Sequence, residues 1–188
     1  MRTLVFLALV LAISFVKAQH PVLAADCKYW RLGGSYIHVV NSQTSDLLGQ
    51  GWGVAGEYSF THALDPEEQI GGGDVSFAVS YRRFDNTTPQ ARNTVDYTSF
   101  ALKWRGGPGA FPSRDGLYAG VGVAAALLTI RPNPIDFGPH YGLTKFEWSA
   151  LGGANFAHCL YVELSYNSIP HIGDLTLQQF TVTFGGRF

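Results

Sequence analysis

The sequence is poor in charge. Of its 188 residues only 14% are Asp, Glu, Lys or Arg, although 46% are hydrophobic. Soluble proteins carry roughly 25% charged residues, because water has to solvate most of their surface. The chain therefore has too few charges for an ordinary water-facing surface. Its net charge of −1 also gives no basic field that would attract nucleic acid, so no nucleic-acid partner is expected.

Long apolar runs are also absent beyond the first 25 residues. A transmembrane helix needs about 20 consecutive apolar residues, and the best candidate, residues 117–130, is rich in Gly and Ala and alternates in polarity. An open sheet would leave unpaired backbone groups in hydrocarbon. Any membrane-spanning structure in this chain is therefore expected to be a closed β-barrel.

Residues 1–25 have the pattern of a secretory signal peptide. Arg2 precedes an apolar run over residues 4–16, and small residues follow, so that cleavage is expected after Ala18 or as late as Ala25. Asp26 stands before Cys27, where a lipoprotein would have a small residue. We therefore expect an exported chain in which residues 26–188 form one domain.

The final residues alternate in polarity. From residue 180 one face holds Phe180, Val182, Phe184 and Phe188, and the other holds Thr181, Thr183, Gly185 and Arg187. A period of two is that of a β-strand, and an apolar face toward lipid with a polar face toward a lumen explains it. Leu175 and Leu177 are in the opposite phase, which predicts a β-bulge or the exit from the membrane at residues 178–179.

Seven earlier segments alternate in the same way, and polar, Gly- or Pro-rich connectors separate them. The segments are residues 29–40, 51–60, 74–84, 94–105, 116–130, 144–154 and 159–168. No helical pattern lies between them, so consecutive antiparallel hairpins are expected to close on themselves. The sequence predicts an all-β fold, an eight-stranded antiparallel up-and-down transmembrane β-barrel. A soluble sandwich or lipocalin-like barrel is the alternative, but it would need a charged exterior.

The predicted inward face carries charges of both signs. They are Arg31, Glu57, Arg82, Lys103, Lys145, Glu147, Glu163 and Arg187. Eight strands leave an interior that side chains fill, and unpaired buried charges are costly. We therefore expect these charges to pair as a plug, with Glu163 and Glu57 as partners of Arg187, rather than to line a channel or a catalytic site. The outward aromatic residues lie mostly near strand ends, as membrane-interface girdles do.

Other chemical signals are weak. Cys27 and Cys159 fall at predicted strand ends on one side, so a disulfide between them and two free thiols are both open. The histidines have no metal-ligand spacing, and neither a metal nor a cofactor is expected. Ser165 and Ser168 lie near His171, but no nucleophile, base and orienting group can be assembled specifically.

The chain resembles the small eight-stranded outer-membrane barrels of Gram-negative bacteria, the OmpA/OmpX-like proteins. The apolar leader, the stretches LYAGVGV at residues 117–123 and YVELSY at 161–166, and the ending FGGRF carry the resemblance. It implies a protein of the cell outer membrane with both termini in the periplasm and outer-membrane lipid around it. Phe184, Arg187 and Phe188 resemble the terminal signal that the barrel assembly machinery reads. The connectors 41–47, 85–93, 131–141 and 169–173 would then face outward from the cell.

The same resemblance includes lipid A-modifying enzymes, the PagL-like deacylases, which carry His-x-Ser-Asn on a late strand. The corresponding stretch here is Leu164-Ser165-Tyr166-Asn167-Ser168, without the histidine. The expected function is therefore a structural or surface-interaction role in the cell envelope, and not that of an enzyme. A lipid hydrolase and a narrow channel are the alternatives.

Overall fold

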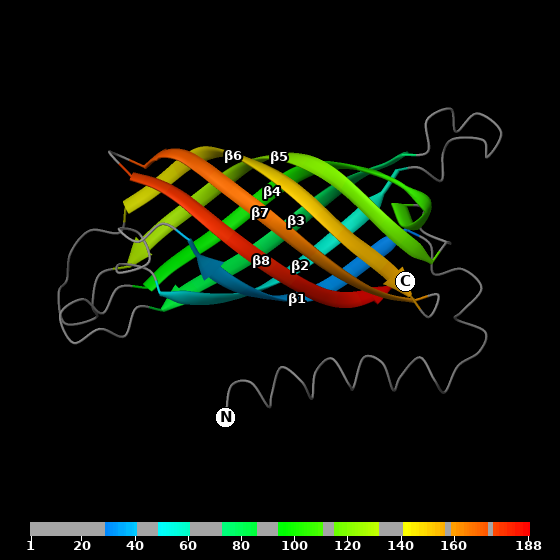
Figure 1. Ribbon diagram of the computed structural model, residues 1–188. Coiled ribbons are helices and arrows are strands. Elements are labelled where there is room, and N and C mark those ends of the chain that lie inside the picture. Colours follow the sequence, from blue (N-terminus) through cyan, green and yellow to red (C-terminus); the bar gives the residue numbers. More distant parts are fainter. Residues whose placement is uncertain are drawn as a thin grey trace, which may run out of the picture.

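Eight antiparallel strands close into a barrel in chain order, with β1 paired to β8 (Figure 1). The computed structural model describes residues 29–40, 49–60, 73–85, 94–110, 115–131, 141–156, 159–172 and 175–188. The strands are β1 (Trp30–Val39), β2 (Gln50–Ser59), β3 (Gly73–Asp85), β4 (Thr94–Gly106), β5 (Gly116–Arg131), β6 (Tyr141–Phe156), β7 (Leu160–Ile172) and β8 (Leu175–Arg187), with a 3₁₀ turn, η3 (Pro108–Ala110), after β4. None of the described residues forms a helix long and apolar enough to cross a membrane. The predicted fold is confirmed.

The strand boundaries differ from the prediction mainly in β6 and β7. β7 continues to Ile172, so most of the connector expected at residues 169–173 is strand. The pairing of β7 with β8 is irregular between Ile169 and Ile172. Of the two alternatives expected at residues 178–179, the β-bulge is wrong, because the pairing runs unbroken from the Ile169–Leu177 pair to the Leu160–Gly186 pair.

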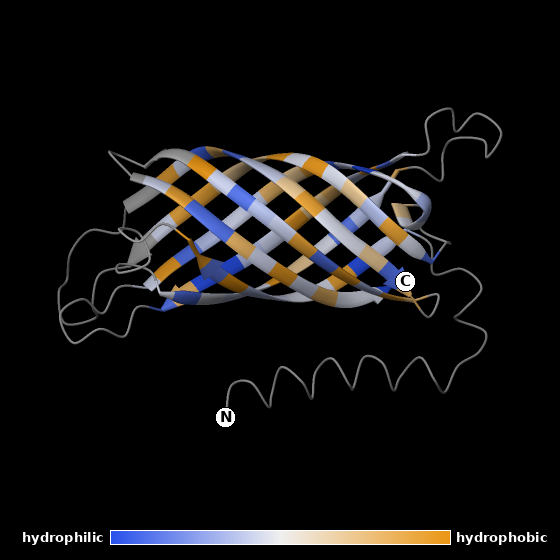
Figure 2. Cartoon of the chain, in the orientation of Figure 1, coloured by the Kyte–Doolittle hydropathy of each residue, from blue (hydrophilic) through white to orange (hydrophobic). Residues whose placement is uncertain are grey.

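Hydropathy alternates along much of each strand (Figure 2), and buried residues alternate with exposed ones. On β4, for example, Phe100, Leu102 and Trp104 are exposed, whereas Ala101 and Arg105 are buried. Because lipid would surround the outer face, these exposed apolar side chains need no water-facing cover. The low charge content therefore follows from the architecture.

The alternation inverts at the end of the barrel away from the termini, by which we mean the start of β1 and the end of β8. There the interior holds an apolar cluster of Ile37, Val39, Phe84, Val95, Tyr97, Ala126, Leu128, Ile169 and Leu177. The neighbouring outward positions at this end are polar, among them His38, Gln50 and Gln178. This part of the barrel is organised like a soluble barrel, with apolar residues inside and polar residues outside. Leu177 and Thr181 thus lie on one inner face, and the change of phase at residues 178–179 reflects a change of environment.

The outer apolar band has the height that a membrane requires. On β8 it covers residues 180–188, which span about 23 Å along the barrel axis at a rise of ~3.3 Å per residue and a tilt of ~40°. Outer-membrane barrels have an apolar band about 25 Å tall. Trp52 and Tyr81 at one end, and Trp30 and Tyr58 at the other, form aromatic contacts near its two edges.

The inversion predicts where the membrane ends on β8. A nitroxide label at residue 182 should collide more often with oxygen than with a water-soluble nickel chelate, and a label at residue 178 should show the reverse order. Continuous-wave electron paramagnetic resonance in lipid nanodiscs measures both, with Cys27 and Cys159 replaced by Ser. Equal accessibility at the two positions would contradict a boundary between them.

Candidate functional site

Arg105, near the end of β4, lies inside the barrel and is fully buried. Its Nη1 and Nη2 donate to the two carboxylate oxygens of Glu57 at 2.5 and 2.7 Å. Its Nε and Nη2 donate to Glu163 Oε2 at 3.1 and 2.8 Å, and Nη1 also donates to Ser76 Oγ at 2.9 Å. One guanidinium therefore joins β2, β4 and β7, which are not neighbours in the sheet.

Three more charged side chains complete this group. Lys103 Nζ lies 3.4 Å from Glu57 Oε2 and 3.0 Å from Glu163 Oε1. Arg31 Nε lies 3.8 Å from Glu57 Oε1, and Asp74 Oδ2 lies 3.8 Å from Arg105 Nη1 and accepts a hydrogen bond at Oδ1 from Ser59. We call this group the Arg105 cluster; its members are Arg31, Glu57, Asp74, Lys103, Arg105 and Glu163. It holds three cations and three carboxylates, so its charges balance.

Tyrosine rings pack around the cluster. The Arg31 guanidinium lies 5.3 Å from the ring centre of Tyr118 and 5.5 Å from that of Tyr161, and Tyr118 Oη donates to Glu163 Oε2 at 3.3 Å. A Cβ atom at Gly153 would stand 2.5 Å from Tyr118 Oη. This glycine on the inner face of β6 therefore provides the space that the Tyr118 side chain fills.

A second ion pair lies farther from the termini. Arg82 Nη2 donates to Glu147 Oε1 at 3.3 Å, both side chains are largely buried, and the guanidinium lies 4.9 Å from the ring centre of Tyr97. A cluster of small inward side chains, Ala78, Ala101 and Ala124, lies on β3, β4 and β5 beside these charges. Lys145 is half-buried on the inner face of β6, and within the described part of the chain it makes no ion pair.

The η3 turn covers the barrel end next to the termini (Figure 1). Ala110 is fully buried, and its carbonyl accepts a hydrogen bond from Arg31 Nη2 at 3.5 Å. Asn155 donates from Nδ2 to the carbonyl of Gly109. Beside the turn, Arg187 Nη2 lies 3.4 Å from Asp115 Oδ1. The interior is thus covered by η3 at this end and filled by the apolar cluster at the other.

The interior differs from the sequence-based expectation in its centre. Six of the eight predicted lumen residues are buried, and Lys103 and Lys145 are half-buried. Arg105 and Asp74, which face each other on β4 and β3, were not among the eight. Both stand at the ends of predicted strands, where alternation is hard to follow. The signal that Arg105 offers is its position two residues after Lys103. Among the described residues Arg187 reaches Asp115, not Glu163 or Glu57.

The C-terminal residues are held by neighbouring strands. Phe184 packs against Phe156 with ring centres 6.1 Å apart. The backbone of Phe188 donates to the Trp30 carbonyl at 2.7 Å and accepts from the Trp30 amide at 3.0 Å. Cys159 is half-buried and forms no disulfide with another described residue. Cys27 lies outside the described residues, so a disulfide between the two stays a prediction.

The other residues that could take part in catalysis lie in the barrel interior or outside the described residues. Ser165 is buried in the interior, where Asn167 Nδ2 donates to Ser165 Oγ at 3.1 Å and to Thr181 Oγ1 at 3.0 Å. The side chain of His171 lies outside the described residues. Within the described ranges, no group of three or more His, Cys, Asp and Glu side chains is placed to hold a metal ion.

The Arg105 cluster predicts a large loss of stability when its centre is removed. Arg105→Met should lower the free energy of unfolding by about 3–5 kcal/mol, because Glu57 and Glu163 are left buried without their main partner. Urea unfolding in lipid vesicles, followed by tryptophan fluorescence, measures this change. The matched control is Arg83→Met, which removes a partly exposed ion pair with Asp85 and should cost less than ~1 kcal/mol. Similar losses for both variants would contradict a central role for Arg105.

Comparison with known proteins agrees with this architecture. Residues 6–188 match the family model of the outer membrane protein β-barrel domain. No curated protein matches the sequence. The N-terminal barrel of Pseudomonas aeruginosa OprF is similar in structure, with 14% identity and a TM-score of 0.61, over 86% of this chain and 98% of that one.

Two other solved structures are similar over the same share of this chain. Neisserial surface protein A has 14% identity and a TM-score of 0.57 over 96% of its own chain. The Yersinia pestis outer membrane protein Ail, in a phospholipid bilayer nanodisc, has 12% identity and a TM-score of 0.53 over 99% of its own chain. At these identities the likeness shows the fold alone. With the family model matched over nearly its whole length, the chain belongs to the outer membrane protein β-barrel domain family.

Proposed function

We propose that this protein is a structural barrel of the cell outer membrane with a sealed interior. Its surface away from the termini would contact other components of the cell envelope or partners outside the cell. The observation that carries the proposal is the Arg105 cluster. Arg105 makes hydrogen bonds to Glu57 and Glu163, which lie on strands in different parts of the wall. Every member of the cluster except the partly exposed Lys103 is nearly inaccessible to solvent. Such an interior stabilises the barrel wall. Because its charges are already paired with one another, they are not available to bind a ligand.

Two different seals oppose the passage of ions. Near the termini, an ion that crosses would have to displace Arg105 from its carboxylates, which costs several kcal/mol in a buried setting. At the other end, Phe84, Leu128 and Leu177 fill the interior with apolar groups that water does not solvate. These two arrangements support a closed barrel over a narrow channel.

Export and insertion follow from the two ends of the chain. Residues 1–25 would direct secretion, and β8 would present Phe184, Arg187 and Phe188 to the barrel assembly machinery. In support, Phe184 belongs to the outer face of β8, whereas Arg187 points inward and is buried. β8 pairs with both β7 and β1, so its placement closes the barrel. Outer-membrane lipid would then cover the exposed apolar face.

A role as a lipid hydrolase has less support. Ser165 faces the interior and is hydrogen-bonded to Asn167, away from the lipid-facing side where an acyl substrate would arrive. The strand stretch around it also lacks the histidine of the deacylases. We therefore propose no enzymatic activity. The ends of β1, β3 and β5 lie beyond the apolar band. They lead into the connectors that would contact partners outside the cell.

Planar-bilayer recording tests the sealed interior. The wild-type protein should give no single-channel steps, because each of the two seals is sufficient to block ions. The variant Phe84→Ala/Leu177→Ala, which hollows the apolar cluster, should also be silent, since the Arg105 cluster remains intact. Regular openings of the wild-type protein at neutral pH would overturn the proposal in favour of a channel. Heat-modifiable migration in gels verifies that both proteins are folded.

A further inference from the structure

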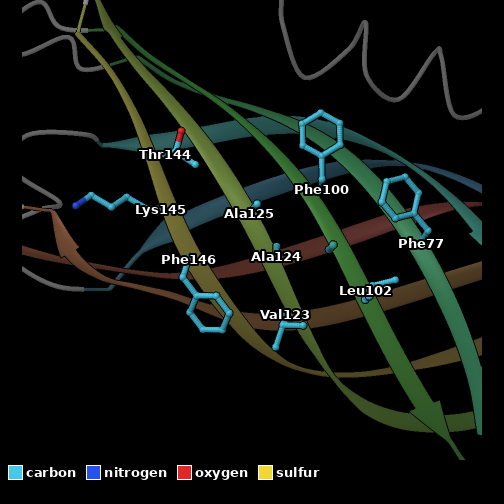
Figure 3. Close-up of a pocket in the computed structure, with 10 residues that line it drawn as sticks. Phe77, Phe100, Leu102, Val123, Ala124, Ala125, Thr144, Lys145 and Phe146 are labelled. Atoms are coloured by element: carbon cyan, nitrogen blue, oxygen red, sulfur yellow. The ribbon is translucent and has the colours of Figure 1, made fainter.

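An open apolar groove of about 570 Å³ runs over the outer face of β4, β5 and β6. Phe100 and Phe146 form its two walls and Ala125 its floor, as Figure 3 shows. The three residues lie in one row of the sheet, because Phe100 pairs with Ala125 and Ala125 pairs with Phe146. Both phenylalanines are exposed, with 42% and 58% of their surface accessible. The groove is thus a gap in the row where the middle strand carries a methyl group.

The groove changes in polarity along its length. One row toward the termini, Leu102 pairs with Val123, and both are apolar and exposed. One row away from the termini, Thr98 and Thr144 lie on either side of Leu127, and each is paired with it. Thr144 lines the groove, and Thr98 lies beyond its lining residues. These two hydroxyl groups lie where the outer face changes from apolar to polar. The groove therefore has an apolar body and a hydroxyl-bearing mouth at the membrane boundary.

The width of the groove matches one hydrocarbon chain. Neighbouring strands are about 4.8 Å apart, so the backbones that carry Phe100 and Phe146 are separated by roughly 10 Å. Two aromatic rings standing on these strands leave room for a single extended chain above Ala125. An unfilled gap would deprive both rings of contacts on one side. Lys145, at the edge of the groove, extends away from Phe146 (Figure 3).

We propose that this groove binds one ester-linked acyl chain of a membrane phospholipid. The chain lies over Ala125 between Phe100 and Phe146, and its ester carbonyl accepts a hydrogen bond from Thr98 or Thr144. The groove is continuous with the apolar face that the family places against lipid, so a lipid reaches it without leaving the membrane. The hydroxyl groups at the mouth match the depth at which ester groups lie, between the hydrocarbon and the headgroups.

Native mass spectrometry of the protein released from vesicles of ester-linked phosphatidylethanolamine tests this proposal. The wild-type protein should retain one lipid molecule. Ala125→Phe fills the groove and should reduce the retained fraction at least ~10-fold. The matched control is Ala119→Phe, which adds the same ring at another exposed alanine of β5, between Gly106 and Gly152, and should retain lipid like the wild type.

A second comparison tests the hydroxyl groups. The wild type should retain ester-linked phosphatidylethanolamine better than the ether-linked lipid, which has no ester carbonyl to accept the hydrogen bond. Thr98→Val/Thr144→Val should remove this preference and leave the retention of the ether-linked lipid unchanged. Equal lipid retention by Ala125→Phe and the wild type would overturn the proposal. A wild-type dimer that Ala125→Phe dissociates would also overturn it, because the groove would then hold a second copy of the chain. If Ala125→Phe shows no heat-modifiable folded form, Ala125→Leu replaces it, with Ala119→Leu as its control.

Discussion

A closed wall of eight strands leaves an interior with no room for bulk water, so a fully buried charge inside it is costly unless it has a partner. Arg105 provides partners for two of the buried carboxylates, those of Glu57 and Glu163. Its five donor hydrogens are shared among Glu57, Glu163 and Ser76, while Lys103 bridges the same two carboxylates from the same strand. The cluster joins strands that the sheet itself does not pair, and the tyrosines and η3 pack against it.

The exterior follows from the same wall. In the apolar band the outward side chains are apolar and would contact lipid, and the inward side chains carry the charges. Beyond the band the two faces exchange these properties. The apolar cluster around Phe84 and Leu177 is therefore organised like the small hydrophobic core of a soluble barrel. The charged interior of the apolar band lies next to it, toward the termini. The groove over Ala125 lies just below this change, where a lipid would contact both hydroxyl and aromatic side chains.

Alternation alone was enough to predict the class of fold and the number of strands. It was not enough to identify Arg105, because that residue lies beside a Gly-rich connector where the strand end is ambiguous. The partners of each charge depend on the tilt of the strands, which brings Glu57 and Glu163 to Arg105 from far apart in the sequence. Leu177 left two alternatives open in the sequence, because an inverted environment and a bulge produce the same change of phase.

The coupling free energy between Arg105 and Glu163 measures most directly whether the buried cluster holds the barrel together. It is obtained from urea unfolding in lipid vesicles of the wild type, Arg105→Met, Glu163→Gln and the double variant. A central ion cluster predicts that the double variant loses less stability than the sum of the single losses, by about 1–3 kcal/mol. Losses that add to within about 0.5 kcal/mol would contradict it, because the two side chains would then act independently.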